Sequence, residues 1–150
     1  MSKVYTDFIH GVLLGVTSVT VTLSFGPCNL NINGSPMTFH SGVDMVPAVK
    51  VTPIEKARVK EIGSNATDGN YIVLQHGDDT ESVFKHLVPG SILAKVGDIV
   101  LRGPAIATSG RTGNTSGAHC HLGIRVKGVW VDPIPYLQGI KKLTPYLDLT

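Results

Sequence analysis

The sequence predicts a mostly β fold made of many short strands. Seventeen Gly and nine Pro are spread along the 150 residues, which favours short strands and turns over long helices. Residues 17–25 alternate strictly between apolar side chains and Ser or Thr, the pattern of a half-buried strand. The apolar runs Tyr71–Gln75 and Ser82–Leu87 flank the polar segment HGDDTE and predict an antiparallel hairpin.

The second half of the chain continues this pattern. Lys127-Gly128 is expected to form a tight turn between the last two of its strands. A helical tendency is confined to Ile54–Ile62 and Tyr136–Lys142, and Pro135 suits the start of the second. Four further short strands are expected, at Ile99–Leu101, Ile106–Thr108, His121–Val126 and Val129–Val131.

Length and composition predict one globular domain. Apolar residues make up 42% and charged residues 16% of the chain, too apolar for a disordered tail. No linker-like break in composition occurs, so we expect residues 1–24 to form an N-terminal strand or extension of a main domain at residues 25–150. The formal charge of +2, without a Lys/Arg run, predicts no nucleic-acid partner. No stretch approaches the roughly 18 uninterrupted apolar residues of a membrane span.

Two further expectations concern the N-terminus and the cysteines. The opening segment MSKVYTDFIHGVLLGV is a poor signal peptide, because Asp7 and His10 interrupt its apolar run and no small-x-small cleavage site follows. Cys28 and Cys120 are expected to be free thiols.

Candidate chemistry begins with the segment GAHCHLGI, residues 117–124. In a strand, His119 and His121 lie on one face with Cα atoms roughly 6.6 Å apart, while Leu122 and Ile124 face the core. Two imidazoles in this arrangement can lean towards one point. Taken alone, the pair is more typical of two solvated polar positions on an exposed face.

The segment HSGVD changes that balance. His40 and Asp44 would lie roughly 13 Å apart in a straight strand, too far to share a metal, so the chain must turn between them. Gly42 supplies the conformational freedom for the turn. Together with a histidine of the HxH pair they make a three-ligand zinc site with room for water, which is the catalytic pattern.

Seven segments occur in an order and spacing that resemble the lysostaphin-type zinc metallopeptidases, over about Phe25 to Leu137. They are SFGP, FHSGVD, NYIVLQHG, FKHL, VGDIVLRG, GRTGNTSGAHCHLGIR and VDPIPYL. The paired HxxxD and HxH are the specific elements. The resemblance implies a duplicated hybrid motif fold, an antiparallel β-sheet crossed by a substrate groove.

The resemblance also implies roles for five residues. The ligands of one Zn²⁺ ion fall on His40, Asp44 and His121, and the catalytic histidines fall on His86 and His119. The implied substrates are peptide crosslinks or stem peptides of bacterial peptidoglycan. All five residues are present, whereas catalytically dead relatives usually lack some of them.

The chain departs from the family pattern at three places. Phe84-Lys85 precedes His86 where the family often has a tyrosine and a small residue. Gly123 stands where an acidic residue commonly follows the HxH pair, and no tyrosine lies just ahead of FHSGVD. His76, in LQHGDD, is expected to be solvated or to support the site, and GRTGNTSG is expected to form a turn flanking it.

The leading hypothesis is therefore a zinc endopeptidase acting at the bacterial cell wall, encoded by a phage or prophage or excised from a longer wall hydrolase. The alternative is a module of the same fold that binds peptidoglycan or a partner without cutting. A third reading comes from Lys95–Ala107, which has the rhythm of a lipoyl or biotinyl carrier. That reading is disfavoured because the candidate hairpin tip HGDDTE carries no lysine to modify.

Overall fold

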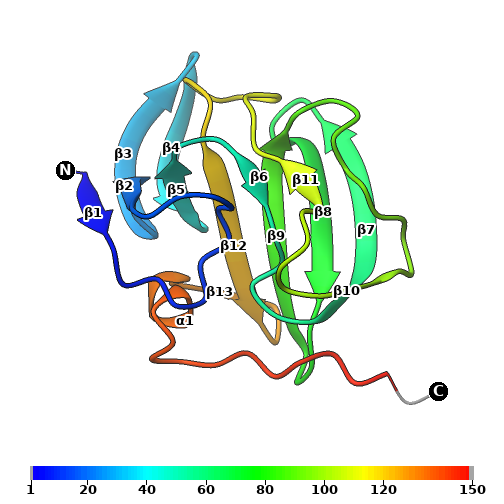
Figure 1. Ribbon diagram of the computed structural model, residues 1–150. Coiled ribbons are helices and arrows are strands. Elements are labelled where there is room, and N and C mark those ends of the chain that lie inside the picture. Colours follow the sequence, from blue (N-terminus) through cyan, green and yellow to red (C-terminus); the bar gives the residue numbers. More distant parts are fainter. Residues whose placement is uncertain (1, 149–150) are drawn as a thin grey trace.

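A nine-stranded antiparallel sheet organises the molecule (Figure 1), for which a computed structural model describes residues 2–148. Strand β13 (Val129–Val131) pairs with β12 beside the main path of strands. Along that path the order is β1 (Lys3–Tyr5), β2 (Val19–Leu23), β5 (Val43–Val46), β12 (Cys120–Val126), β9 (Thr80–Leu87), β8 (Gly69–Gln75), β7 (Ala57–Asn65) and β10 (Ile99–Val100).

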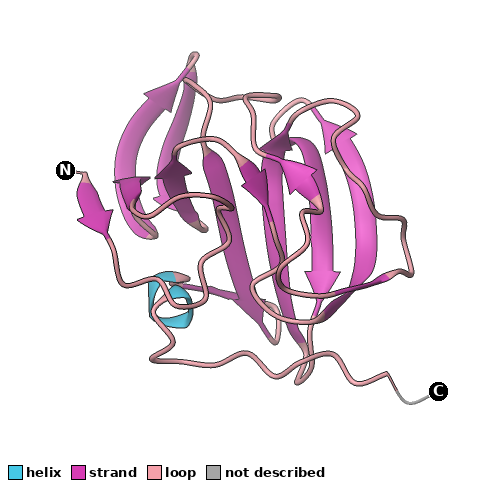
Figure 2. Cartoon of the chain, viewed as in Figure 1, coloured by secondary structure: helices cyan, strands magenta, loops and turns pink. Residues whose placement is uncertain are grey.

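Two small strand pairs lie beside this sheet. Strands β3 (Gly26–Ile32) and β4 (Ser35–His40) form a hairpin next to β2 and β5, and β6 (Lys50–Val51) pairs with β11 (Ala107–Thr108) in front of the central strands (Figure 1). Within residues 2–148, the only α-helix is the short α1 (Ile134–Leu137; Figure 2). The prediction of a mostly β, antiparallel fold is confirmed.

The core lies between one face of the sheet and the segments that carry β6 and β11. Because side chains alternate along a strand, Leu122 and Ile124 of β12 point into this core while His121 points to the opposite face. The core residues include Val12, Val21, Val43, Met45, Val51, Ile54, Val59, Ile72, Leu74, Phe84, Leu87, Ile106, Leu122, Ile124 and Leu137. One face of the sheet therefore carries the hydrophobic core, which leaves the other face for chemistry.

Several predicted elements are confirmed. Strands β8 and β9 form the predicted hairpin, and β2 follows the alternating segment with Val19 and Val21 buried. The turn between β12 and β13 has Lys127 at φ 49° and Gly128 at φ 79°, the paired positive φ of a type I′ turn.

The two predicted helical segments need correction. Ile54–Ile62 is not helical, because Ala57 onwards forms β7 with β8 on one side and β10 on the other. Pairing on both sides outweighs the helix propensity of the Glu, Lys, Ala and Arg residues in this segment. The helix predicted at Tyr136–Lys142 starts earlier and spans only four residues, with Gly139 at φ 77° just after its end.

His76 was predicted to be solvated or to support the site, and it does neither. Its side chain is 1% exposed and lies at the other end of the β8–β9 hairpin from the predicted site residues. Nδ1 donates to the carbonyl of Lys56 at 3.1 Å, so Nε2 accepts from the hydroxyl of Ser82 at 2.8 Å. Burial lowers the pKa of His76, which keeps the ring neutral.

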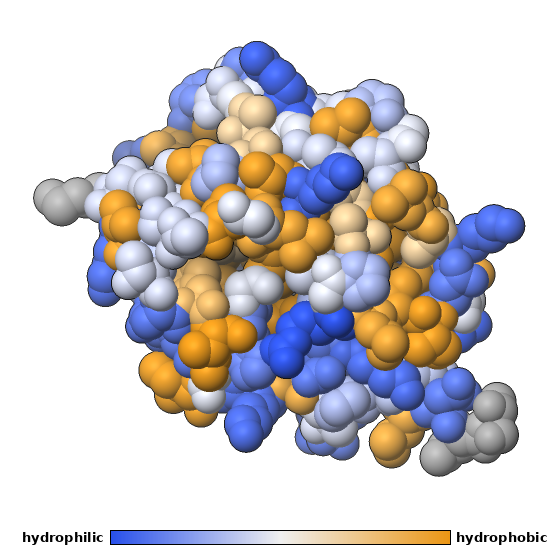
Figure 3. Space-filling model, in the orientation of Figure 1, coloured by the Kyte–Doolittle hydropathy of each residue, from blue (hydrophilic) through white to orange (hydrophobic). Residues whose placement is uncertain are grey.

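The surface is mixed in polarity. Hydrophilic and hydrophobic residues are interspersed over the face drawn in Figure 3. Among the described residues, no helix is long and apolar enough to cross a membrane. Cys28 and Cys120 are both free, as predicted, and Cys120 is part of the core.

Candidate active site

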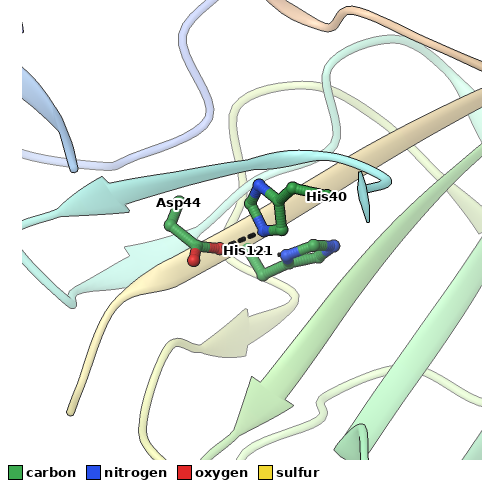
Figure 4. A group of neighbouring side chains, drawn as sticks. All are labelled: His40, Asp44 and His121. Atoms are coloured by element: carbon green, nitrogen blue, oxygen red, sulfur yellow. Dashed lines mark hydrogen bonds and ion pairs between the residues drawn. The ribbon is translucent and has the colours of Figure 1, made fainter. Parts of the chain in front are cut away.

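The chain brings His40, Asp44 and His121 together from three strands (Figure 4). His40 ends β4, the chain turns through Ser41 and Gly42, and Asp44 lies in β5. Strand β5 pairs with β12 so that Asp44 stands directly opposite His121. Two residues four apart in sequence and a third far along the chain thus converge on one point.

The distances within this group suit a metal ion. Oδ1 of Asp44 lies 3.3 Å from Nε2 of His40 and 3.0 Å from Nδ1 of His121. Zinc bonds of about 2.0–2.1 Å at tetrahedral angles place ligand atoms roughly 3.3 Å apart. The ligand atoms of the three residues all lie within 4.8 Å of one another.

The hydrogen bonds around the group also fit a metal. Nδ1 of His40 donates to the carbonyl of Ser24 at 3.1 Å, which leaves Nε2 as the nitrogen with a free lone pair. Nδ1 of His121 faces Oδ1 of Asp44 and is the nitrogen that its ring turns towards the group. A partly buried carboxylate, two convergent nitrogens and no thiolate make a ligand set suited to Zn²⁺ with a further position for water.

Electrostatics keep Asp44 and His121 in the forms that a metal binds. Burial alone would raise the pKa of Asp44, but the surrounding imidazoles of His119, His121 and His40 hold it well below its usual range. Burial lowers the pKa of His121 to about 4, against the opposing influence of Asp44. The carboxyl is therefore ionised and His121 is neutral at pH 7.

His119 lies beside the group but outside it. Nδ1 donates to the carbonyl of Gly117 at 2.9 Å, and Nε2 lies 3.2 Å from Oδ1 of Asp44, at ion-pair distance without the alignment of a hydrogen bond. Burial lowers the pKa of His119, but contacts with Asp44 outweigh it and leave the pKa raised. This histidine is not part of the group of three whose ligand atoms all approach one another.

His86 faces His119 across the site because the backbone bends there. It has φ 61° within β9, opposite an irregularity in the pairing with β8. For a residue other than Gly this left-handed conformation is uncommon, and such strain gathers at functional sites. The ring centroids of His86 and His119 are 5.3 Å apart.

The free nitrogen of His86 is defined by its backbone partner. Nδ1 donates to the carbonyl of Thr112 at 2.6 Å, which leaves Nε2 unprotonated in the neutral ring. Burial, together with the nearby charges of His119 and Lys85, lowers the pKa of His86. Thr112 belongs to the glycine-rich segment GRTGNTSG. This segment flanks the site, as predicted.

A groove of about 520 Å³ runs over these residues. Asn33, at the tip of the β3–β4 hairpin, donates to Asn114 Oδ1 at 3.1 Å, which joins the two walls at that point. The apolar wall comes from β3 and β4 and consists of Leu30, Ile32, Met37 and Phe39. The polar wall consists of Thr67, Asp68, Lys85, Asn114, Thr115 and Ser116.

Sequence reasoning missed the backbone partners of the histidines and misjudged Gly42. The carbonyls of Ser24, Thr112 and Gly117 leave no trace in residue type, so no sequence signal reveals them. Gly42 does not have a positive φ; a Cβ there would overlap the carbonyl oxygen of Leu122 and lie 2.9 Å from Nε2 of His121. The glycine is required for close approach of the turn to β12.

Comparison with known proteins now identifies the family. The model of peptidase family M23 matches residues 38–133, which include all five of these residues. The chain belongs to peptidase family M23. Peptidoglycan DD-endopeptidase ShyC of Vibrio cholerae is 32% identical over 127 residues, covering 80% of this chain and 29% of that protein. The murein hydrolase activator NlpD of Escherichia coli is 41% identical over 69 residues, covering 46% of this chain and 17% of that protein.

Solved structures agree with the family and the fold. The catalytic domain of lysostaphin from Staphylococcus simulans superposes with a TM-score of 0.67 at 31% identity, covering 77% of this chain and 90% of that one. A zinc-containing peptidase from Vibrio cholerae gives a TM-score of 0.66 at 28% identity, covering 83% of this chain and 37% of that one. This chain spans between a fifth and a third of the length of the curated endopeptidases and metalloprotease that it matches.

The tight approach at Gly42 predicts a defect in both folding and metal binding when that residue is enlarged. Gly42→Ala should lower the free energy of unfolding by about 1–3 kcal/mol, because the added methyl group pushes the turn away from β12. It should also weaken zinc binding, since the same methyl group crowds His121. Thermal unfolding and zinc titration calorimetry measure the two effects.

Gly11→Ala is the matched control, because a Cβ at Gly11 makes only ordinary contacts of 3.5 Å with Phe8. It should leave zinc affinity unchanged. A Gly42→Ala variant with wild-type stability and zinc affinity would contradict this account of the turn.

Proposed function

We propose that this chain is a zinc-dependent endopeptidase that cleaves peptide crosslinks or stem peptides of bacterial peptidoglycan. The observation that carries the proposal is the convergence of His40, Asp44 and His121, with His86 and His119 alongside, at the floor of one groove. The Asp44 and His119 side chains keep 15% and 12% of their surface exposed, so a substrate in the groove can reach them.

His40, Asp44 and His121 are the proposed ligands of one Zn²⁺ ion. An ion held there would polarise the scissile carbonyl and lower the pKa of its bound water to about 7. The protein contributes the orientation of the ligands: the carbonyl of Ser24 holds the His40 ring, and strand pairing holds Asp44 against His121.

His86 and His119 are the proposed catalytic histidines. Each has its Nδ1 proton engaged by a backbone carbonyl, so each presents Nε2 to the site. One of them is suited to accept the proton of the attacking water, and together they can stabilise the oxyanion and deliver a proton to the leaving amine. The backbone bonds fix both rings, which reduces the entropy lost on reaching the transition state.

The peptidoglycan assignment is supported by the relatives. ShyC and other Vibrio cholerae proteins that this chain resembles are named peptidoglycan DD-endopeptidases. We accordingly propose that the chain acts at the bacterial cell wall, either as a phage or prophage enzyme or as a domain of a longer hydrolase. Residues 25–150 form the proposed peptidase domain and residues 1–24 its N-terminal strand or extension.

A second candidate function is favoured by one observation. The relatives with 41% identity over 69 residues are named as NlpD, a murein hydrolase activator. A non-catalytic chain of that kind would bind peptidoglycan or a partner in the same groove. The five site residues line the groove and support catalysis instead. Binding alone would need neither three metal ligands nor two histidines with oriented Nε2 atoms.

Digestion of purified peptidoglycans separates the two functions. The zinc-loaded chain should release peptide fragments, identified by mass spectrometry, from at least one crosslink type. A chelator should abolish release, and added zinc should restore it, because the ligand set lacks thiolates and exchanges metal reversibly. Full activity after exhaustive chelation, with elemental analysis finding no metal, would rule out the zinc mechanism. Binding without release from any crosslink type would favour the non-catalytic function.

Alanine variants of the two histidines of the HxH pair should differ in zinc content. His121→Ala should lose both zinc and activity, since it removes a ligand. His119→Ala should retain near-stoichiometric zinc while kcat falls by about two to four orders of magnitude, the usual worth of one acid–base or oxyanion group. His86→Ala should behave like His119→Ala.

Elemental analysis and turnover are measured on the same preparations. Equal loss of zinc from His119→Ala and His121→Ala would make both residues ligands and end this division of roles.

A further inference from the structure

One lysine lies in the groove beside the histidines. Of the groove-lining residues that the structure describes, Lys85 alone is a Lys or Arg. Its side chain is 19% exposed, and Nζ lies 3.2 Å from Oδ1 of Asp68. An ammonium group has three N–H donors, and this ion pair occupies one of them.

The position of Lys85 places its charge close to the proposed reaction centre. It directly precedes His86 in β9 and stands opposite His121 in the pairing of β9 with β12.

The indole of Trp130 lies near Lys85. It packs against Gly123, two residues after His121 in β12, where a Cβ would lie 2.8 Å from Cζ3 of Trp130. Nζ of Lys85 lies 5.9 Å from the centroid of the Trp130 ring. Beside His121, this chain therefore has a lysine and an indole.

Two other cations lie near Lys85 in the sheet, and both are paired with one carboxylate. Arg125 lies over Trp130 at 4.8 Å from the ring centroid, and its Nε donates to Glu81 at 2.9 Å. Lys60 forms an ion pair with the same Glu81 carboxylate. Neither Arg125 nor Lys60 lines the groove, so Lys85 is the cation that a bound substrate meets.

We propose that Lys85 makes this chain selective for crosslinks that carry a free carboxylate beside the scissile bond. The inference rests on the proposed peptidase function and names its substrate class. A carboxylate in the groove takes a second N–H of Lys85 in a charge-assisted hydrogen bond, next to the apolar edge of Trp130.

The test uses two crosslinked peptides that differ only in whether the carboxyl group beside the scissile bond is free or amidated. For the zinc-loaded wild-type chain, kcat/KM should favour the free carboxylate about tenfold, the worth of one charge-assisted hydrogen bond at a partly exposed site. Lys85→Gln should bring the ratio of the two rates close to one, and Lys85→Arg should retain the preference. Calorimetry of the same peptides with zinc-loaded His119→Ala should give the same ratio in affinity.

Two further variants sharpen the result. Lys95→Gln, which removes an exposed lysine outside the groove, should leave the ratio at its wild-type value. Asp68→Asn should increase the preference, because it frees the Lys85 ammonium. Equal cleavage of the two peptides by the wild type, or a preference that survives Lys85→Gln, would overturn the selectivity while leaving the peptidase function intact. Cleavage of neither peptide, nor of any crosslink, would overturn the peptidase function itself.

Discussion

The arrangement of the site depends on one partly buried carboxylate. Oδ1 of Asp44 has nitrogen atoms of His40, His119 and His121 at 3.3, 3.2 and 3.0 Å. Removing a carboxylate from water costs several kcal/mol unless opposite charge and hydrogen bonds compensate for it. Three imidazoles around one oxygen supply this compensation in part, and a divalent cation would complete it. Strands β4, β5 and β12 bring these groups together.

The sheet makes this possible by dividing its two faces. Leu122 and Ile124 anchor β12 in the core, so His121 is fixed on the opposite face without a loss of stability. The close approach of the Ser41–Gly42 turn to β12 brings the proposed ligands His40 and Asp44 next to His121. The positive φ of His86 is a local strain that the paired strands around it can support.

The sequence was a good guide to the β class and to which residues meet. Alternation in β2 and the turn signal at Lys127-Gly128 report local backbone preferences, which are readable without tertiary information. The HxxxD and HxH motifs combine histidines with an aspartate, a combination that is typical of a metal site. By contrast, the helix predicted at Ile54–Ile62 is wrong. Helix propensity is a property of the local sequence, whereas the pairing of β7 with β8 and β10 depends on segments that are distant in the chain. The burial of His76 and the carbonyl partners of the histidines also depend on distant segments, so no local pattern encodes them.

The central claim is that Asp44 organises a zinc site on a sheet that folds without the metal. Zinc titration calorimetry of Asp44→Asn, together with thermal unfolding of the metal-free protein, tests it most directly. The asparagine keeps the shape of the side chain and removes its charge, so the account predicts a cooperative unfolding transition and a loss of stoichiometric zinc binding. Zinc bound by Asp44→Asn with wild-type affinity, or a variant that no longer folds, would contradict the account.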